Sequence, residues 1–345
     1  MSDRGNSAAV RPRVFLTNRV FPQVIADLGK FADVDGNLSA EPLPREEFLA
    51  RASRADAMMV FMNDSLDAAL LDTCPNLCVV AAALKGCDNF DVAACTARGI
   101  WFTIVPEMLT IPTAELAIAL ALGLARKVAQ GDRFIRSGQF SGWRPLLYGT
   151  GFRGKTAGIV GMGNLGRALA KRLAAFDMKI LYADPAPLSE AAEKELRAVR
   201  VESRELMFVS DFVFLLMPLS PATIHLFNEA TLSVMKPTAF LINVARGSVV
   251  AEAAVAQALS SGKLAGYAAD VFEMEEWARP DRPSGIHPSL LAQADKTLFT
   301  PHLGSAVKET RLEIELRAAH NITEALAGRR PPDAINEPRP RSKAV

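Results

Sequence analysis

The sequence predicts an α/β protein that contains two parallel β-sheets, each covered by helices. Three observations support this fold class. Short apolar, β-branched runs alternate with helix-like segments along most of the 345 residues, which is the pattern of parallel strands joined by helical crossovers. These runs fall into two blocks, and a Gly-Met-Gly-Asn-Leu-Gly turn at 161–166 stands early in the second block. The chain is also long enough for two domains of ordinary size.

The first block contains the strand-like runs 14–20, 57–62, 78–84 and 101–105. We expect these runs to form a smaller, substrate-binding domain over 12–108. Far downstream, 308–327 has the spacing of an amphipathic helix with its charges on one face, and we expect it to return to the same domain. The substrate domain would then be discontinuous, with 306–330 as its second part.

A long apolar segment at 112–137 separates the two blocks. It begins with Thr-Ala-Glu and keeps a helical apolar periodicity, which predicts a helix. Because it is very apolar for a surface helix, we expect it either to be buried between domains or to pack on a second subunit.

The second block, assigned to 109–305, contains six strand-like runs. They lie at 156–160, 179–183, 212–217, 240–244, 266–272 and 297–300. Six parallel strands are the number in a full dinucleotide-binding sheet. The polar tails at 1–11 and 331–345 have little apolar character, and we expect them to be disordered.

Composition excludes several classes of partner. The net charge is only +1, from 39 basic and 38 acidic residues, so we expect neither nucleic acid nor an anionic membrane as a partner. The longest apolar stretch, 116–125, is far shorter than the roughly 20 residues of a membrane-spanning helix. The first 13 residues lack the apolar core of a signal peptide. These features indicate a soluble, cytoplasmic protein.

The four cysteines lie close together in the sequence, at positions 74, 78, 87 and 95. Their spacings match no zinc pattern and contain no Cys-x-x-Cys pair. We therefore interpret them as reduced structural thiols, and we expect no metal site.

The glycine-rich turn predicts a nucleotide site, because a strand-like run leads into it and a helix-like segment leads out. Gly161 would allow the tight turn, Gly163 the approach of a pyrophosphate, and Gly166 close packing of helix and strand. The helix N-terminus would offer amide groups to the phosphates. We expect Asn164 and Leu165 to be the main donors.

Asp184 closes the next strand-like run, 18 residues after Gly166. A carboxylate at that point can accept hydrogen bonds from ribose hydroxyls and would repel a 2′-phosphate. Pro185 follows, and no Arg or Lys occurs before Lys194. The sequence therefore favours NAD over NADP.

Three charged or titratable residues follow later strand-like runs. His302 lies in Thr-Pro-His after the run at 297–300, and histidine is the natural general base near neutral pH. Glu275, five residues after Asp270, is a carboxylate that could orient the imidazole. Arg246 has the planar fork that suits a bound oxyanion.

Other residues of the same types are assigned less specific roles. We interpret His225, His287 and His320 as surface or packing residues. Glu273 and Glu276 are neighbours of Glu275 and are not expected to replace it.

Five motifs resemble the D-2-hydroxyacid dehydrogenases and cover most of 75–320 in the family's order. They are the glycine-rich turn, Leu-Met-Pro-Leu, Asn-Val-Ala-Arg-Gly-Ser-Val-Val, Ala-Asp-Val-Phe-Glu-x-Glu and Thr-Pro-His-x-Gly-Ser. The resemblance implies two Rossmann-like, doubly wound domains, the smaller one flavodoxin-like. It also implies that Arg246 binds the substrate anion and that Glu275 supports His302 as the acid/base. Further NAD contacts are expected at Thr113, Pro218, Val244, Ala245 and Asp270.

The substrate loop departs from ordinary members of that family. Where they read roughly Gly-Val-Gly-x-Asp-x-Ile-Asp, this chain has Ala-Leu-Lys-Gly-Cys-Asp-Asn-Phe-Asp, with Lys85 beside Gly86. Glu276-Trp277 also replaces the usual Pro after the catalytic Glu. In these features the chain is similar to the phosphonate (phosphite) dehydrogenases within the family. This similarity implies a substrate-binding set of Met62, Lys85, Gly86, Trp143, Tyr148 and Arg246. Arg311, one or two helix turns beyond His302, is a further candidate.

We therefore expect NAD-dependent oxidation of phosphite to phosphate. Phosphite is a small dianion, and its burial requires more positive charge than that of a monocarboxylate. Lys85, Arg246 and Arg311 could supply this charge.

Several alternatives remain. The chain could be an ordinary 2-hydroxyacid dehydrogenase or a glyoxylate/hydroxypyruvate reductase. A formate dehydrogenase is disfavoured, because that relative pairs its His with Gln. An NAD-binding corepressor is disfavoured by the neutral charge and the lack of long extensions. The resemblance also implies a homodimer, formed through 112–137.

Overall fold

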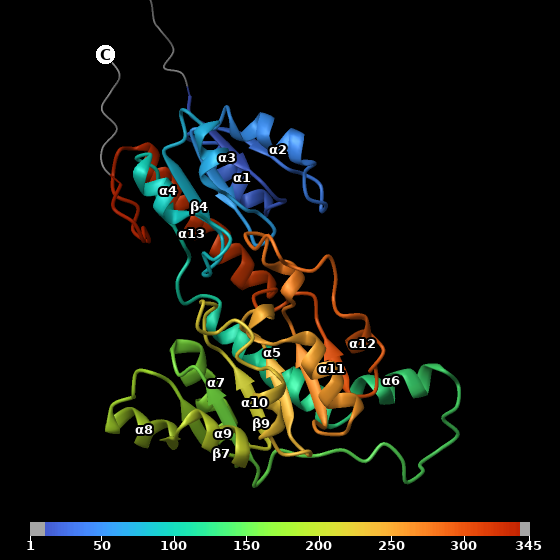
Figure 1. Cartoon of the computed structure of the whole chain (residues 1–345). Coiled ribbons are helices and arrows are strands. Elements are labelled where there is room, and N and C mark those ends of the chain that lie inside the picture. Colours follow the sequence, from blue (N-terminus) through green and yellow to red (C-terminus); the bar gives the residue numbers. More distant parts are fainter. Residues whose placement is uncertain (1–10, 339–345) are drawn as a thin grey trace, which may run out of the picture. The chain divides into compact units, whose positions relative to one another are not determined.

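The computed structural model describes residues 11–338. These residues form two compact units, each with its own sheet (Figure 1). Unit 1 comprises Met1–Met108, Trp277–Arg279 and Lys308–Val345 as far as they are described, and unit 2 comprises Leu109–Glu276 and Pro280–Val307. The expected tails at 1–10 and 339–345 lie outside the described residues.

Within the described residues, unit 1 has a five-stranded parallel sheet in the order β2-β1-β3-β4-β5. The strands are β1 (Arg13–Leu16), β2 (Asp33–Gly36), β3 (Ala57–Val60), β4 (Val79–Ala82) and β5 (Trp101–Thr103). This order is that of flavodoxin-like folds, which confirms the predicted class. The sequence did not predict β2, because Asp-Val-Asp-Gly has no apolar run. Its place at the sheet edge comes from backbone pairing with β1.

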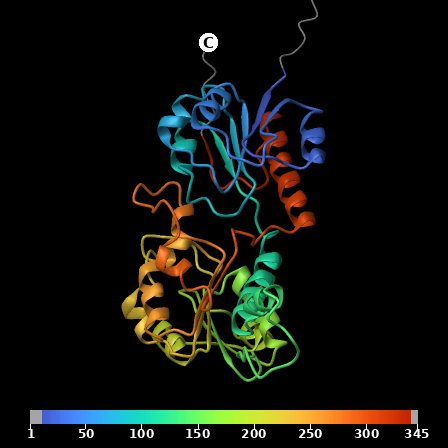
Figure 2. The same ribbon diagram turned by 90° about the vertical axis from the view of Figure 1, so that its right-hand side faces the viewer.

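Helices cover both faces of this sheet. On one face, α1 (Pro22–Leu28) packs beside α13 (Lys308–Leu326), which contacts β3 and β4; Figure 2 shows α13 in red along the unit 1 sheet. On the other face lie α2 (Arg45–Ala52), α3 (Ala68–Asp72) and α4 (Val92–Ala97). Buried apolar side chains of the strands and of these three helices form one core.

The segment 331–338 is ordered, so the predicted disorder was wrong for these residues. Asn336 accepts a hydrogen bond from the Phe102 amide at 2.8 Å and donates one to the Ile100 carbonyl at 3.0 Å. Asp333 forms a two-point ion pair with Arg317 of α13. Polar side chains thus bind this segment to the edge strand and to a helix, where apolar patterning gave no signal.

Within its described residues, unit 2 has a seven-stranded parallel sheet in the order β12-β11-β10-β9-β6-β7-β8. Its strands are β6 (Thr156–Val160), β7 (Lys179–Ala183), β8 (Ala198–Arg200), β9 (Phe212–Leu215), β10 (Phe240–Asn243), β11 (Gly266–Ala269) and β12 (Thr297–Phe299). The order is that of a dinucleotide-binding sheet with one added strand. The sequence did not predict β8, which is short and has two exposed residues of three.

Two helical layers enclose the unit 2 sheet. One contains α5 (Thr110–Ala125), α7 (Asn164–Ala174) and α8 (Glu190–Leu196). The other contains α9 (Ser203–Val209), α10 (Glu229–Ser233), α11 (Glu252–Ser260) and α12 (Pro288–Leu291). Two short 3-10 turns, η1 (Gly247–Val249) and η2 (Glu273–Glu275), follow β10 and β11.

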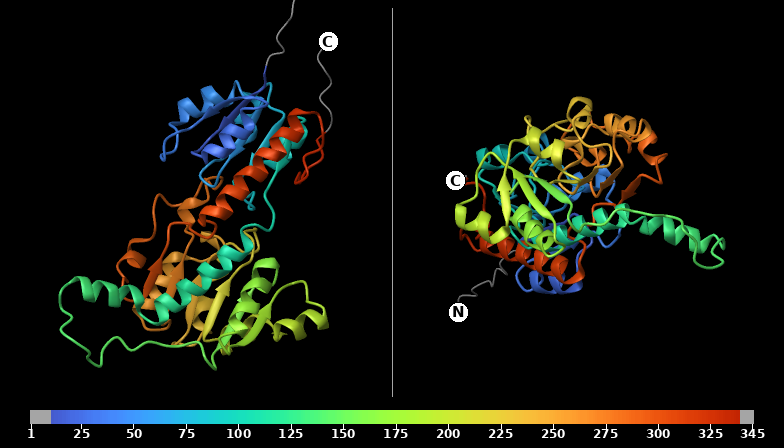
Figure 3. Two further views of the ribbon diagram at one scale, coloured as in Figure 1. Left: turned by 180° about the vertical axis from the view of Figure 1, so that it is seen from behind. Right: turned by 90° about the horizontal axis from the view of Figure 1, so that it is seen from below.

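The apolar segment at 112–137 is two helices rather than one. Lys127 adopts a left-handed conformation, with φ of 55°, between α5 and α6 (Val128–Arg136). α5 packs against α7, β10 and β11, so its apolar residues belong to the unit 2 core. α6 has no buried residue, and Figure 3 shows it and the following loop, in green, projecting from the rest of unit 2.

Membrane and metal features are absent within residues 11–338. No helix there is long and apolar enough to cross a membrane, and no group of His, Cys, Asp or Glu is placed to hold a metal ion. All four cysteines, which lie in this range, are free thiols. Burial raises the pKa of Cys95 to about 12, so this thiol stays protonated and inert.

Candidate active site

The glycine-rich turn joins β6 to α7, and packing constrains two of its three glycines. Gly161 has a φ of +100°, and a Cβ there would lie 2.8 Å from the Met217 amide nitrogen. A Cβ at Gly166 would lie 2.3 Å from the Gly161 carbonyl oxygen. At Gly163, by contrast, a Cβ would have no described atom within 4 Å. Two glycines are thus required by packing, while the third leaves open space where a pyrophosphate can approach.

The turn fits a dinucleotide phosphate. Gly163 is the N-cap of α7 and makes no side-chain hydrogen bond to the first amide groups of the helix. Asn164 is exposed and Leu165 half-buried at the start of the helix, where amide groups and the helix dipole favour an anion.

Asp184 lies directly after β7 and braces the same turn. Its carboxylate accepts hydrogen bonds from the amides of Met162 at 2.7 Å and Ala186 at 2.8 Å. Arg200 of β8 donates to the Asp184 carbonyl at 3.0 Å and the Pro185 carbonyl at 3.4 Å. Sequence reasoning missed Arg200, because only the pairing of β7 with β8 brings it here.

The other expected NAD contacts lie at strand or helix ends in unit 2. Pro218 follows β9, and Val244 and Ala245 follow β10. Thr113, in the first turn of α5, donates to the Gly304 carbonyl at 3.2 Å. All four residues are therefore close to carboxyl ends of strands or to the loop that carries His302.

His302 and Glu275 form a close pair. His302 Nδ1 lies 2.5 Å from Glu275 Oε2, and each side chain is 25% exposed. The other oxygen of Glu275 accepts a hydrogen bond from the Phe272 amide at 2.7 Å. With Nδ1 facing the carboxylate, Nε2 is the ring nitrogen at the opposite edge of the imidazole.

The backbone of His302 is unusual, with a left-handed φ of 56°. Asp270 holds this loop: its carboxylate accepts hydrogen bonds from the Thr300 hydroxyl at 2.5 Å and from the amides of Leu303 and Gly304 at 2.7 and 2.8 Å. Burial is the main reason that the pKa of Asp270 is raised. The structure thus places Asp270, expected near the nicotinamide, beneath the His302 loop, where it stabilises a strained backbone.

Arg246 follows β10 and precedes η1. The buried Asn243 shapes this turn, accepting a hydrogen bond from the Ala245 amide at 3.0 Å and donating to the Arg246 carbonyl at 2.9 Å. A Cβ at Gly247 would lie 1.9 Å from the Phe272 carbonyl carbon. Only glycine allows η1 and η2 to approach so closely, and this packing brings the segment of Arg246 against that of Glu275.

In unit 1, Lys85 follows β4, next to the partly buried Gly86. Its side chain is 49% exposed, and Nζ lies 3.7 Å from a Glu107 carboxylate oxygen. Arg311 of α13 donates to the Ala83 carbonyl at 3.2 Å. Arg311 thus binds the loop that carries Lys85.

The Arg311 guanidinium has two further partners in unit 1. It lies over the Phe61 ring, 5.8 Å from the centroid, and 3.5 Å from Glu315. Burial raises the pKa of Glu315 and lowers that of Arg311, while the attraction between them opposes both shifts. Met62, partly buried, follows Phe61 at the end of β3. Four of the expected substrate residues therefore gather at the carboxyl ends of β3 and β4: Met62, Lys85, Gly86 and Arg311.

Trp143 and Tyr148 lie in the loop between α6 and β6. They are 83% and 73% exposed. The Thr150 amide binds the Ala125 carbonyl at the C-terminal end of α5, whereas Thr113, near the His302 loop, is at its other end. Twelve helical residues separate these two ends by about 18 Å. The expected contact of Trp143 and Tyr148 with the substrate therefore remains a prediction.

The remaining histidines have distinct places. His225 Nε2 lies 2.9 Å from Glu273, His287 caps α12 by accepting from the Ser289 amide, and His320 is exposed.

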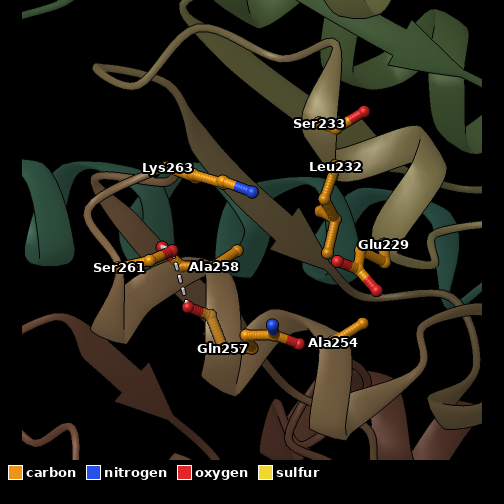
Figure 4. A pocket seen from close by; sticks show the side chains of 8 residues that line it. All are labelled: Glu229, Leu232, Ser233, Ala254, Gln257, Ala258, Ser261 and Lys263. Carbon is orange, nitrogen blue, oxygen red and sulfur yellow. Dashed lines mark hydrogen bonds between the residues drawn. The ribbon is translucent and has the colours of Figure 1, made fainter.

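A hollow on the surface of unit 2 lies beside α10 and α11, and contains none of the residues discussed above (Figure 4). Its lining consists of Glu229, Leu232, Ser233, Ala254, Gln257, Ala258, Ser261 and Lys263.

The site in unit 2 agrees with comparisons to known proteins. The family model of the D-isomer specific 2-hydroxyacid dehydrogenase NAD-binding domain matches residues 118–304. The chain is 39% identical to a glyoxylate reductase of Aeropyrum pernix, over 94% of this chain and 96% of that protein. It is 37% identical to a glyoxylate reductase of Thermococcus litoralis, over 95% and 98%.

Solved structures show the same similarity. A protein of Thermus thermophilus has a TM-score of 0.83 and 35% identity, covering 94% of this chain and 99% of that one. A glyoxylate reductase from Paecilomyes thermophila has a TM-score of 0.80 and 28% identity, covering 94% and 98%. The chain therefore belongs to the D-isomer-specific 2-hydroxyacid dehydrogenase family and is an NAD-dependent oxidoreductase.

Proposed function

We propose that this NAD-dependent oxidoreductase oxidises phosphite to phosphate. The observation that carries the proposal is the second cationic group in unit 1, where Arg311 binds the loop that carries Lys85. The proposal assigns Arg246 of unit 2 to the same small substrate as a third cation. A dianion needs this positive charge more than a monocarboxylate does, because each uncompensated charge is costly to remove from water.

The chemistry assigns one role to each side chain. Bound NAD supplies the acceptor for a hydride. His302, held through Nδ1 by Glu275, takes a proton at Nε2 from the attacking water. The water oxygen forms a bond to phosphorus as the P–H bond breaks and its electron pair leaves with the hydrogen. Lys85, Arg246 and Arg311 stabilise the charge of the phosphorus oxyanion throughout.

A second candidate is reduction of glyoxylate or a similar 2-oxoacid. The named relatives favour it, since those from Aeropyrum pernix and Thermococcus litoralis are glyoxylate reductases at 39% and 37% identity. In that reaction, His302 would donate a proton to the carbonyl oxygen, and Arg246 would bind the carboxylate. The same fold and trio serve both reactions, so the choice depends on the groups that bind the substrate.

Parallel assays on the purified chain decide between these candidates. We expect NADH to form from NAD and phosphite, and we expect slower oxidation of NADH with glyoxylate or hydroxypyruvate. Turnover of the 2-oxoacids alone would replace the proposal by the second candidate. Turnover of neither substrate would favour the NAD-binding corepressor.

Lys85→Ala provides a sharper test of the same proposal. Because Lys85 is half-exposed, solvent screening should limit the loss, and we expect the KM for phosphite to rise about tenfold to a hundredfold. Lys85→Arg is the matched control that keeps the charge, and it should recover part of the loss. An unchanged KM for phosphite in Lys85→Ala would remove this residue from the substrate site.

We also propose that the protein is a homodimer whose contact includes α6 and the loop after it. α6 has no buried residue, and two of its apolar side chains, Val128 and Ile135, are 60% and 52% exposed. The loop adds exposed Phe140, Trp143 and Tyr148. Apolar side chains collected on one projecting segment favour burial against another protein surface, and a second copy of the chain is the partner we propose.

A further inference from the structure

Glu276 is a buried carboxylate that immediately follows Glu275, the partner of His302. It is 3% exposed, and one of its oxygens accepts a hydrogen bond from the Ser248 amide at 2.8 Å. The other oxygen accepts from the Ser248 hydroxyl. Ser248 itself is completely buried, two residues after Arg246. A charged acceptor that binds both donors of one residue is a strong constraint on its backbone.

The same residue is held from a second side. The His225 amide donates to the Ser248 carbonyl at 2.6 Å, while the His225 ring contacts Glu273 at 2.9 Å. The Glu273 amide donates to the Glu252 carboxylate at 3.2 Å, and the Glu252 amide donates to the Glu273 carboxylate at 3.3 Å. Ser248 is therefore fixed through its amide, hydroxyl and carbonyl, and these bonds connect it to η2 and the residue that follows it.

These contacts link the two halves of the site in unit 2. Arg246 is the N-cap of η1, and Glu275 is the last residue of η2. The backbone contact between Gly247 and Phe272 sets how close the two turns lie, and the bonds from Glu276 set the orientation of η1. A shift of η1 would move the guanidinium relative to the imidazole, and misplacement of about 1 Å at a reacting centre can cost a hundredfold in rate.

We infer that Glu276 is a positioning residue: by holding Ser248, it orients Arg246 toward the substrate anion. The inference rests on the proposed role of Arg246 in anion binding, but not on whether the anion is phosphite or a 2-oxoacid. This role gives a reason for the burial of Glu276, which lies next to Glu275 but takes no part in the proton transfer. Removing the carboxylate should impair binding of the acid substrate more than binding of NAD.

The test compares Glu276→Ala and Glu276→Gln with the wild type in steady-state kinetics. We expect Glu276→Ala to raise the KM of the acid substrate about tenfold and to change the KM of NAD less than about twofold. Glu276→Gln keeps an acceptor for the Ser248 amide, so it should recover part of the loss. Ser248→Ala removes only the hydroxyl bond, and an increase of about threefold is expected.

Asp211→Asn is the matched control. Asp211 also accepts hydrogen bonds from an amide and a side chain, Thr156 at 2.9 Å and Lys236 at 3.0 Å, but it lies where β9 begins rather than at its carboxyl end. This control should leave both KM values unchanged. An unchanged KM for the acid in folded Glu276→Ala would overturn the inference, as would an equal rise in both KM values. If Glu276→Ala does not fold, Ser248→Ala decides, and an unchanged KM there counts against the inference.

Failure of the proposed function can be told apart from failure of this inference. If the wild type turns over neither phosphite nor glyoxylate, binding of sulfate and oxalate to the protein–NADH complex is measured by calorimetry. Weaker anion binding by the Glu276 variants than by the wild type supports the inference. Equal binding, or no binding by the wild type, overturns it.

Discussion

His302 is the residue on which the proposed chemistry depends most directly. We expect His302→Asn to lower kcat about a hundredfold to ten-thousandfold, because general acid–base catalysis contributes on that order. Glu275→Gln should lower kcat less, since an amide can still hold the ring while it loses the charge that stabilises the imidazolium. Stopped-flow or steady-state kinetics at saturating substrate measure both effects. Wild-type kcat in His302→Asn would show that another group moves the proton.

Asp184 should set the preference for NAD over NADP. We expect Asp184→Ala to raise kcat/KM for NADP and to lower kcat/KM for NAD. The ratio of kcat/KM for NAD to that for NADP should fall about tenfold or more. Arg200 donates to the Asp184 carbonyl at 3.0 Å, so it is placed to meet a 2′-phosphate once the carboxylate is gone. The double variant Asp184→Ala/Arg200→Ala should therefore lose the gain. An Asp184→Ala protein with unaltered preference would contradict this assignment.

At the scale of elements, Asp64 joins the ends of two strands in unit 1. It is 7% exposed, and its carboxylate accepts hydrogen bonds from the Phe61 amide at 2.7 Å and from the hydroxyl of Thr17, just after β1. Burial raises the pKa of Asp64 to about 6, although both hydrogen bonds oppose the rise. The turn that it holds carries Phe61, which packs against Arg311, and Met62.

The raised pKa makes the stability of unit 1 depend on pH. The folded state holds the Asp64 proton more tightly than the unfolded chain does, so this contribution is complete below pH about 4 and is lost as pH rises through about 6. A pKa difference of this size between the two states corresponds to roughly 3 kcal/mol. Denaturant unfolding between pH 4 and 8 should show this loss in the wild type and not in Asp64→Asn. Asp67→Asn, at the exposed cap of α3, is the control that should keep the wild-type slope; the same slope in Asp64→Asn would contradict the prediction.

At the scale of the whole molecule, the proposed dimer depends on α6 and the loop after it. We expect light scattering to give a dimer for the wild type and a monomer for Ile135→Glu/Phe140→Ser, because a charge and a hydroxyl would replace apolar contact surface. Leu38→Glu is the matched control, since Leu38 is 76% exposed but lies in unit 1. A monomeric wild type, or a double variant that stays dimeric, would exclude this surface as the interface.

Apolar patterning predicted most of the fold, and its failures have identifiable causes. The strands with continuous apolar runs, such as β9 and β10, are buried along their whole length. The edge strands β2 and β8 and the segment 331–338 are polar, and are held by backbone pairing or by side chains such as Asn336. The break at Lys127 left no signal either, because a lysine in a left-handed conformation looks like any helical lysine in sequence.

The candidate site divides in the same way. His302, Glu275, Arg246 and the glycine-rich turn could be found from sequence, because parallel strands put their following loops at one edge. Arg200, Asn243 and Glu276 could not, since their roles arise from contacts that only the folded chain brings about. Sequence also assigned Trp143 and Tyr148 to the substrate, and in the folded chain both side chains are exposed.

The sequence by itself determined the fold class, the nucleotide turn, NAD as cofactor and the family, because these depend on local residue types at set spacings. The tertiary structure alone decided how those residues are held: Asp270 beneath the His302 loop, Arg311 on the Lys85 loop, and Glu276 on Ser248. The physical reason is that a buried hydrogen bond needs its partner within about 3 Å. That distance is set by the packing of whole elements, which no local pattern of residues records.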